Sequence, residues 1–159
     1  MDLKKKQKAL RLISNGMYII TSRAGAKYGA ATVTWLSQAS FKPPLIMAAI
    51  RPESSVFACL SESRHVAIHI LGSHQQEIAR KFLASTDVKD GLMNGEPFTE
   101  GTTSTPILKN ISSYVECHVR QIVNLGGDHT LVIMEAVHAE HSEDFKPLIV
   151  AESPWKYGG

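Results

Sequence analysis

The segment at residues 51–55 places an arginine and two serines where a predicted strand ends and a predicted helix begins. A helix N-terminus presents free backbone N–H groups and the positive end of the helix dipole, which suits a phosphate group. The hydroxyls of Ser54 and Ser55 add donors, and Arg51 adds a charge able to make bidentate contacts. Helix capping alone would also explain these serines, and the two roles are compatible.

A second candidate is the run at residues 31–40, where a predicted strand passes into a polar stretch before Pro43 and Pro44. A flavin ring needs an apolar wall and fixed N–H donors, because a hydride added at N5 leaves negative charge near N1 and O2. A strand end with small and hydroxyl-bearing residues supplies such donors. An ordinary edge strand with outward polar residues is the alternative interpretation.

A third candidate is the pair Asp128 and His129, which follows Gly126 and Gly127 in a predicted hairpin turn. Asp suits the turn itself. His129 could hydrogen-bond a nicotinamide carboxamide or reach the edge of a flavin, and an exposed turn histidine without a function is the alternative.

Mostly short strands would position these segments. Short strands, a hairpin and a small number of helices favour an antiparallel barrel over a doubly wound sheet. The predicted helices cover residues 3–13, 54–60 and, after a possible capping box from Ser73 to Gln76, a stretch through Phe82. The predicted strands cover residues 17–22, 29–36, 45–50, 65–71, 114–124 and 130–139, with a turn at 24–27 and a long loop at 89–105.

Length and composition restrict the function classes. The 159 residues favour one domain over 1–159, and the net charge is only +2. The lysines near the N-terminus have no aromatic residues between them, so we expect a solvated helix start and no nucleic-acid partner. We expect no membrane partner, because no apolar run is long enough to span a bilayer.

Cysteine and glycine patterns narrow the chemistry further. Cys59 and Cys117 are isolated thiols, which suggests a reducing, cytoplasmic location. No Cys-x-x-Cys motif or Gly-x-Gly-x-x-Gly fingerprint occurs, so an iron–sulfur centre and a Rossmann dinucleotide site are not expected. His138 and His141 alone are too weak a pattern for a metal site. Redox chemistry would therefore need a non-metal cofactor.

Four motifs in order make the chain similar to the flavin reductase family of FMN-binding split barrels, from about Met17 to Tyr157. The run W-L-S-Q-A-S-F-K-P-P at residues 35–44 especially resembles the flavin reductase module at the end of some flavodiiron proteins. The other three motifs are Glu53-Ser54-Ser55, Gly127-Asp128-His129-Thr130 and a closing Pro147-Leu148.

The resemblance implies a mainly β, antiparallel Greek-key split barrel with short helices. It further implies a homodimer with one FMN per subunit near the interface and hydride transfer from NADH or NADPH. A monooxygenase or an electron-carrier protein would then be a partner. The flavin ring and ribityl chain would lie along Thr32, Val33, Thr34, Trp35, Leu36, Ser37 and Gln38. The phosphate would contact Arg51, Ser54 and Ser55, with further contacts from Arg80, Lys81 and Phe82, and His129 would lie near the nicotinamide.

Trp35 departs from the family pattern, because many stand-alone reductases carry a small residue there. A large indole beside the ring could change or prevent nicotinamide stacking. The alternative is therefore a tightly held FMN that exchanges electrons with a protein partner without using NAD(P)H. A relative on the same barrel that binds no flavin also stays open, because fold does not fix function.

Overall fold

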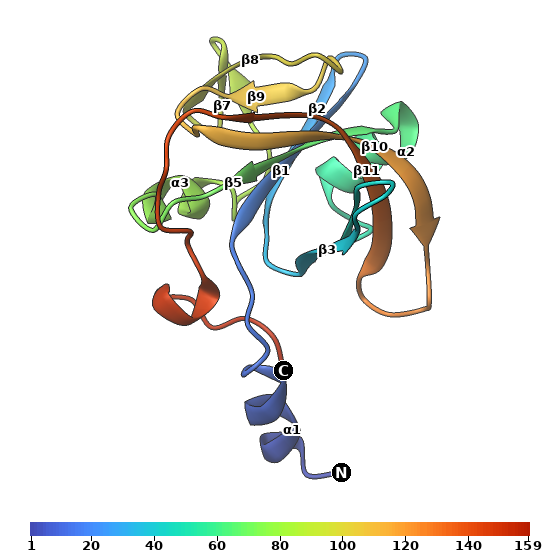
Figure 1. Ribbon diagram of the computed structural model, residues 1–159, viewed down its shortest axis with the longest axis vertical. Helices are drawn as coiled ribbons and strands as arrows, with labels where there is room; N and C mark the ends of the chain where they lie inside the picture. Colours follow the sequence, from blue (N-terminus) through green and yellow to red (C-terminus); the bar gives the residue numbers. More distant parts are fainter.

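The computed structural model describes residues 1–159 and consists mainly of antiparallel strands (Figure 1). Its helices are α1 (Leu3–Leu10), α2 (Ser55–Ser63), α3 (Gln76–Lys81) and the 3-10 helix η1 (Val150–Glu152). Its strands are β1 (Tyr18–Ala24), β2 (Lys27–Val33), β3 (Leu36–Ser40), β4 (Leu45–Ile50), β5 (His65–Ile70), β6 (Val88–Lys89), β7 (Leu92–Met93), β8 (Glu96–Glu100), β9 (Pro106–Leu108), β10 (Ser113–Val123) and β11 (Thr130–His141).

Seven strands form the main sheet in the order β2-β1-β5-β10-β11-β4-β3, and every neighbouring pair is antiparallel. The two edge strands, β2 and β3, are joined only by Thr34 and Trp35. Opposite edges of a sheet can be linked by so short a connection only if the sheet curls back on itself. The Trp35 carbonyl accepts from the Ala49 N–H at 2.9 Å and ties this link to β4. The predicted antiparallel split barrel is confirmed.

The barrel walls separate two hydrophobic cores. Ile20 points into the interior cluster, together with Val66, Val132 and Met134. Its neighbour Ile19 joins the second cluster, because successive strand residues face opposite sides of a sheet. That second cluster fills the space under α3 and the small sheet β6-β7-β8-β9, which lies at the end of the barrel opposite α1 (Figure 1).

Several predicted elements need correction. The strand predicted at 29–36 breaks after Val33, because the chain there crosses from one sheet edge to the other. The capping box from Ser73 to Gln76 is wrong: α3 begins after Gln75, whose side chain accepts from the Gly72 N–H instead of capping the helix. The loop predicted at 89–105 contains β7 and β8 and part of β6.

The N-terminal helix is shorter than predicted and ends at Leu10. Asp2 caps its start. It buries none of its residues and extends away from the barrel, close to the C-terminus (Figure 1). The longest helix, α2, has nine residues, so no helix of this chain could cross a lipid bilayer.

Candidate cofactor site

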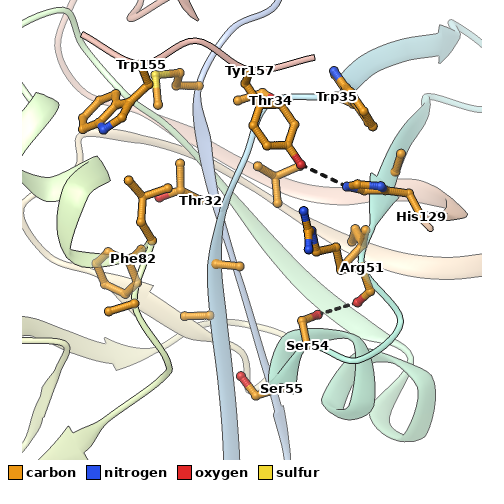
Figure 2. Close-up of a pocket in the computed structure, with 18 of the residues that line it drawn as sticks. Thr32, Thr34, Trp35, Arg51, Ser54, Ser55, Phe82, His129, Trp155 and Tyr157 are labelled. Atoms are coloured by element: carbon orange, nitrogen blue, oxygen red, sulfur yellow. Dashed lines mark hydrogen bonds between the residues drawn. The ribbon is translucent and has the colours of Figure 1, made fainter. Parts of the chain in front are cut away.

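A cavity of about 870 Å³ lies between β2, the start of α2, the segment after α3 and the C-terminal residues (Figure 2). Its size falls within the usual range for small-molecule sites, and its lining is mostly apolar with a few polar groups. One end is formed by the residues around Ser54 and Ser55, and the other by an aromatic group (Figure 2). The cavity thus offers two chemically different ends.

The first end is the N-terminus of α2. Ser54 is the helix cap: its hydroxyl donates to the Arg51 carbonyl at 2.8 Å and accepts from the Phe57 N–H at 3.2 Å. The Ser54 N–H also donates to the Arg51 carbonyl, whereas the Ser55 N–H makes no intrachain bond. The free N–H groups of the first helical turn, together with the helix dipole, make this end suitable for an anion.

The Ser55 hydroxyl is held by the segment after α3. Thr86 Oγ1 donates to the Ala30 carbonyl at 3.1 Å and accepts from the Ala30 N–H at 2.9 Å. Because the only Thr86 hydroxyl proton is used there, Ser55 donates in the 2.7 Å bond between the two hydroxyls. In this arrangement Ser55 offers an incoming anion its backbone N–H rather than its hydroxyl proton.

Strand β2 approaches this helix end at Gly29. A Cβ on Gly29 would lie 2.5 Å from the Val56 nitrogen and from the Ser55 carbonyl oxygen. Both are backbone atoms and cannot rotate away, so only glycine lets β2 pack directly against α2 at this point. This contact fixes the helix start beside the cavity.

Arg51 supplies positive charge at the mouth of the cavity. Its guanidinium is more than half exposed and pairs with Glu53 at 3.6 Å. A hydrogen bond to the Tyr157 hydroxyl raises the pKa of Arg51. The arginine is therefore a permanent cation that contacts both the helix start and the C-terminal segment.

Three aromatic side chains form the other end. The Trp35 ring packs at 4.7 Å from His129 and at 5.2 Å from Tyr157, measured between ring centroids. Asp128 Oδ1 lies 2.9 Å from His129 Nδ1, and the Tyr157 hydroxyl lies 3.1 Å from Nε2 (Figure 2). The hydrogen bond from His129 lowers the pKa of Asp128, so this carboxyl is ionised near neutral pH. Aromatic faces of this kind suit a flat conjugated ligand.

Thr34 carries an unpartnered polar atom beside the cavity. Its hydroxyl oxygen is buried and has no hydrogen-bond partner within the protein. Buried hydroxyls without a partner are rare and costly, so this one is best explained by a missing partner in the cavity that Thr34 lines. A ligand with polar ring edges, such as a flavin, fits that requirement.

The structure brings most of the predicted site residues together. The cavity is lined by nine of them: Thr32, Val33, Thr34, Trp35, Arg51, Ser54, Ser55, Phe82 and His129. Thr32 has a supporting role as well, because its hydroxyl donates to the Ala79 carbonyl at 2.7 Å and its N–H donates to the Phe82 carbonyl at 3.0 Å.

Five predicted residues lie outside this cavity. Leu36 and Ser37 line a second cavity, of about 650 Å³, on the other side of Trp35, and Gln38 is exposed on β3. Arg80 lies over the Trp155 ring at 5.1 Å, and Lys81 pairs with Glu96 at 2.7 Å. Both cations at the end of α3 therefore contact other side chains of this chain.

Sequence reasoning missed the C-terminal residues of the site. The cavity is also lined by Trp155, Lys156 and Tyr157, which follow the last strand of the barrel in the sequence. Two aromatic residues and a lysine among small residues at the end of the chain were the available signal. Thr86 was also missed, because nothing in the sequence links it to Ser55.

The fold and this cavity define a split-barrel protein with a site for a ligand that is anionic at one end and aromatic at the other. The family described as "Flavin reductase like domain" matches residues 10–156, so the chain belongs to this family, as the motifs predicted.

Individual relatives agree with this assignment. An NADH:FMN oxidoreductase from Rhodococcus erythropolis is 33% identical over 86% of this chain and 70% of its own length. A diflavin flavoprotein from Synechocystis is 29% identical over 83% of this chain, which spans only 23% of that longer protein. The solved structure of BorF, the flavin reductase component of a bacterial two-component tryptophan halogenase, superposes with a TM-score of 0.76 at 18% identity, covering 92% of this chain and 91% of BorF.

Proposed function

We propose that this protein is an FMN-binding, NAD(P)H-dependent flavin reductase that transfers a hydride from NADH or NADPH to FMN, with residues 1–159 as one flavin-binding domain. The observation that carries the proposal is that one cavity has a helix N-terminus and Arg51 at one end and Trp35 with His129 at the other. The relative named NADH:FMN oxidoreductase supports the same reaction.

Different residues of the cavity would bind different parts of FMN. The Ser55 N–H, the start of α2 and Arg51 would hold the phosphate. The β2 wall, from Thr32 to Thr34, would lie along the ribityl chain and ring, and the Thr34 hydroxyl would gain the partner it lacks. Phe82 adds apolar area, and His129 would contact the nicotinamide.

FMN, when bound, supplies the hydride acceptor, so no acid or base of the protein is required for the transfer itself. The protein contributes proximity and orientation, which can supply a large part of the rate. Trp35 and Tyr157 pack against each other and give the His129 side of the cavity an aromatic surface.

The physiological assembly is also part of this proposal. We propose a homodimer, supported by the apolar residues Leu10 and Ile13 that α1 and its continuation leave exposed. They line the second cavity together with Leu36 and Met47. A second copy on this surface would bring Leu36, Ser37 and Gln38 into an interface beside Trp35.

We also propose that the protein acts in the cytoplasm, which the free thiols of Cys59 and Cys117 support.

Reduced flavin or its electrons need an acceptor, which we propose is a monooxygenase or an electron-carrier protein. BorF, which is the flavin reductase component of a two-component tryptophan halogenase, supports a separate acceptor.

The reductase activity itself is tested by mixing the protein with FMN and either nicotinamide and following NAD(P)H absorbance. Turnover with at least one nicotinamide is expected, and no turnover with either would refute the proposal.

A further inference from the structure

The C-terminal residue Tyr157 is built into the aromatic end of the cavity by contacts along the whole tail. Trp155 packs beneath the Arg80 guanidinium, and the Arg11 side chain donates to the Gly158 carbonyl at 2.9 Å. The Tyr157 ring lies against Trp35, and its hydroxyl lies 3.1 Å from His129 Nε2. Figure 2 shows this hydroxyl directed at the imidazole. The tail is therefore anchored on both sides of Tyr157.

The hydrogen bonds around His129 fix which ring nitrogen carries the proton. An ionised carboxylate can only accept, so Asp128 requires a proton on His129 Nδ1. In the neutral imidazole Nε2 is then an acceptor, and the Tyr157 hydroxyl donates to it. Both donors then run in one direction, from Tyr157 through His129 to Asp128.

Asp128 alone cannot hold the imidazole firmly. Its side chain is 90% exposed, so water competes for the carboxylate, whereas the His129 side chain is only 11% exposed. The contact on the Nε2 side lies between two rings that pack on Trp35, and Tyr157 is 37% exposed. Tyr157 is thus the better shielded of the two partners that orient His129.

We propose that Tyr157 is a positioning residue for His129, which it holds in the Nδ1–H form with Nε2 directed across the cavity. The effect of this positioning on hydride transfer rests on the proposed function, since His129 is the residue placed near the nicotinamide. Loss of the Tyr157 hydroxyl would leave the FMN phosphate contacts in place but allow the imidazole to rotate and change tautomer.

The direct test is nitrogen NMR of the histidine rings in the protein without flavin, comparing wild type with Tyr157→Phe. Tyr28→Phe is the matched control, because Tyr28 packs against Phe98 away from the cavity. We expect His129 in the Nδ1–H form in wild type and Tyr28→Phe, and a shifted Nε2 signal with mixed tautomers in Tyr157→Phe. A wild-type Nε2–H form, or identical His129 spectra in all three proteins, would overturn the inference.

Kinetics supply a second readout. Tyr157→Phe should lower kcat for NAD(P)H oxidation about fivefold, the usual effect of one lost hydrogen bond, and change the FMN Kd less than twofold. An unchanged kcat, or an equal loss in FMN affinity, would contradict the positioning role. Absence of NAD(P)H oxidation in wild type would instead refute the proposed function, while the NMR comparison would still decide the state of His129.

Discussion

The Arg51 guanidinium should discriminate FMN from riboflavin, because only FMN carries the phosphate. Arg51→Gln should weaken FMN binding about fivefold to tenfold, and riboflavin binding much less. The side chain is largely exposed, so the difference should shrink in high salt. Fluorescence titration with both flavins measures it. Equal losses for FMN and riboflavin would show that Arg51 does not contact the phosphate.

Ser54 should matter first for the helix and only then for the ligand, because its hydroxyl caps α2. Ser54→Ala should lower the free energy of unfolding by about 1 kcal/mol. Urea denaturation measures this, and Ser54→Asp, which can still cap, should recover most of the stability while weakening FMN binding through charge repulsion. Full stability in Ser54→Ala would contradict the capping role.

At the residue scale, the sequence predicted those site residues whose neighbours along the chain define their environment. Ser54 and Ser55 lie in the short passage from a strand to a helix, and His129 lies in a recognisable turn. The partners of Tyr157 and Thr86 could not be predicted, because their contacts with His129 and Ser55 form only when distant segments meet. Residue types alone carry no information about such pairings.

At the element scale, the contact of β2 with α2 depends on Gly29. Gly29→Val should lower the free energy of unfolding by about 2 kcal/mol and weaken FMN binding, because the added carbons would push the helix start away from the strand. Gly127→Ala is a suitable control, since a Cβ there meets nothing closer than 3.7 Å. Comparable stability losses in both variants would argue against the close approach.

His69 links three strands and should make stability depend on pH. Its Nδ1 faces the Ile19 carbonyl on β1 at 3.1 Å, and its Nε2 accepts from the Leu108 N–H on β9 at 3.0 Å. Burial lowers the pKa of His69 to about 4, from 6.5. Below pH 6.5 the unfolded chain takes up this proton before the folded one, so stability falls as pH falls towards 4, by about 3 kcal/mol from this group.

Urea denaturation at several pH values between 7 and 4 tests the His69 prediction. His69→Gln should flatten the pH dependence in this window, whereas His118→Gln, which alters an exposed histidine, should keep it. A wild-type stability that stays constant from pH 6.5 to 4.5 would show that His69 is not held neutral by the fold.

Elements were predictable where local patterns are strong and not where the barrel overrides them. The long strands β10 and β11 and their hairpin were found from β-rich runs around a glycine turn. The break at Thr34 and Trp35 was missed, because β-formers continue through it and only barrel closure requires it. The short strands β6 to β8 were missed for the opposite reason, since glycines and prolines in that region hide the pairing.

At the scale of the whole molecule, α1 should contribute to assembly rather than to folding. It buries no residue, and Leu3 is 71% exposed. Deletion of residues 1–10 should therefore shift Tm by less than about 3 °C and convert the proposed dimer into a monomer. Light scattering during size exclusion measures the mass. A wild-type protein that runs at 17.4 kDa at micromolar concentration would contradict the dimer.

The overall architecture was the most predictable level, because strand patterns and short connections leave few alternatives to an antiparallel barrel. The closure of the sheet by a link of only Thr34 and Trp35 explains why the site lies where it does. This link brings the end of β2, the start of α2 and the turn before β11 to one cavity.

The reduction of FMN by a nicotinamide is tested most directly by the visible spectrum of the protein with FMN, recorded anaerobically before and after one equivalent of NADH or NADPH. We expect bound flavin to bleach with at least one nicotinamide, and the colour to return when air is admitted. Flavin that binds but keeps its oxidised spectrum with both nicotinamides would contradict the reductase, and flavin that does not bind at all would contradict the site.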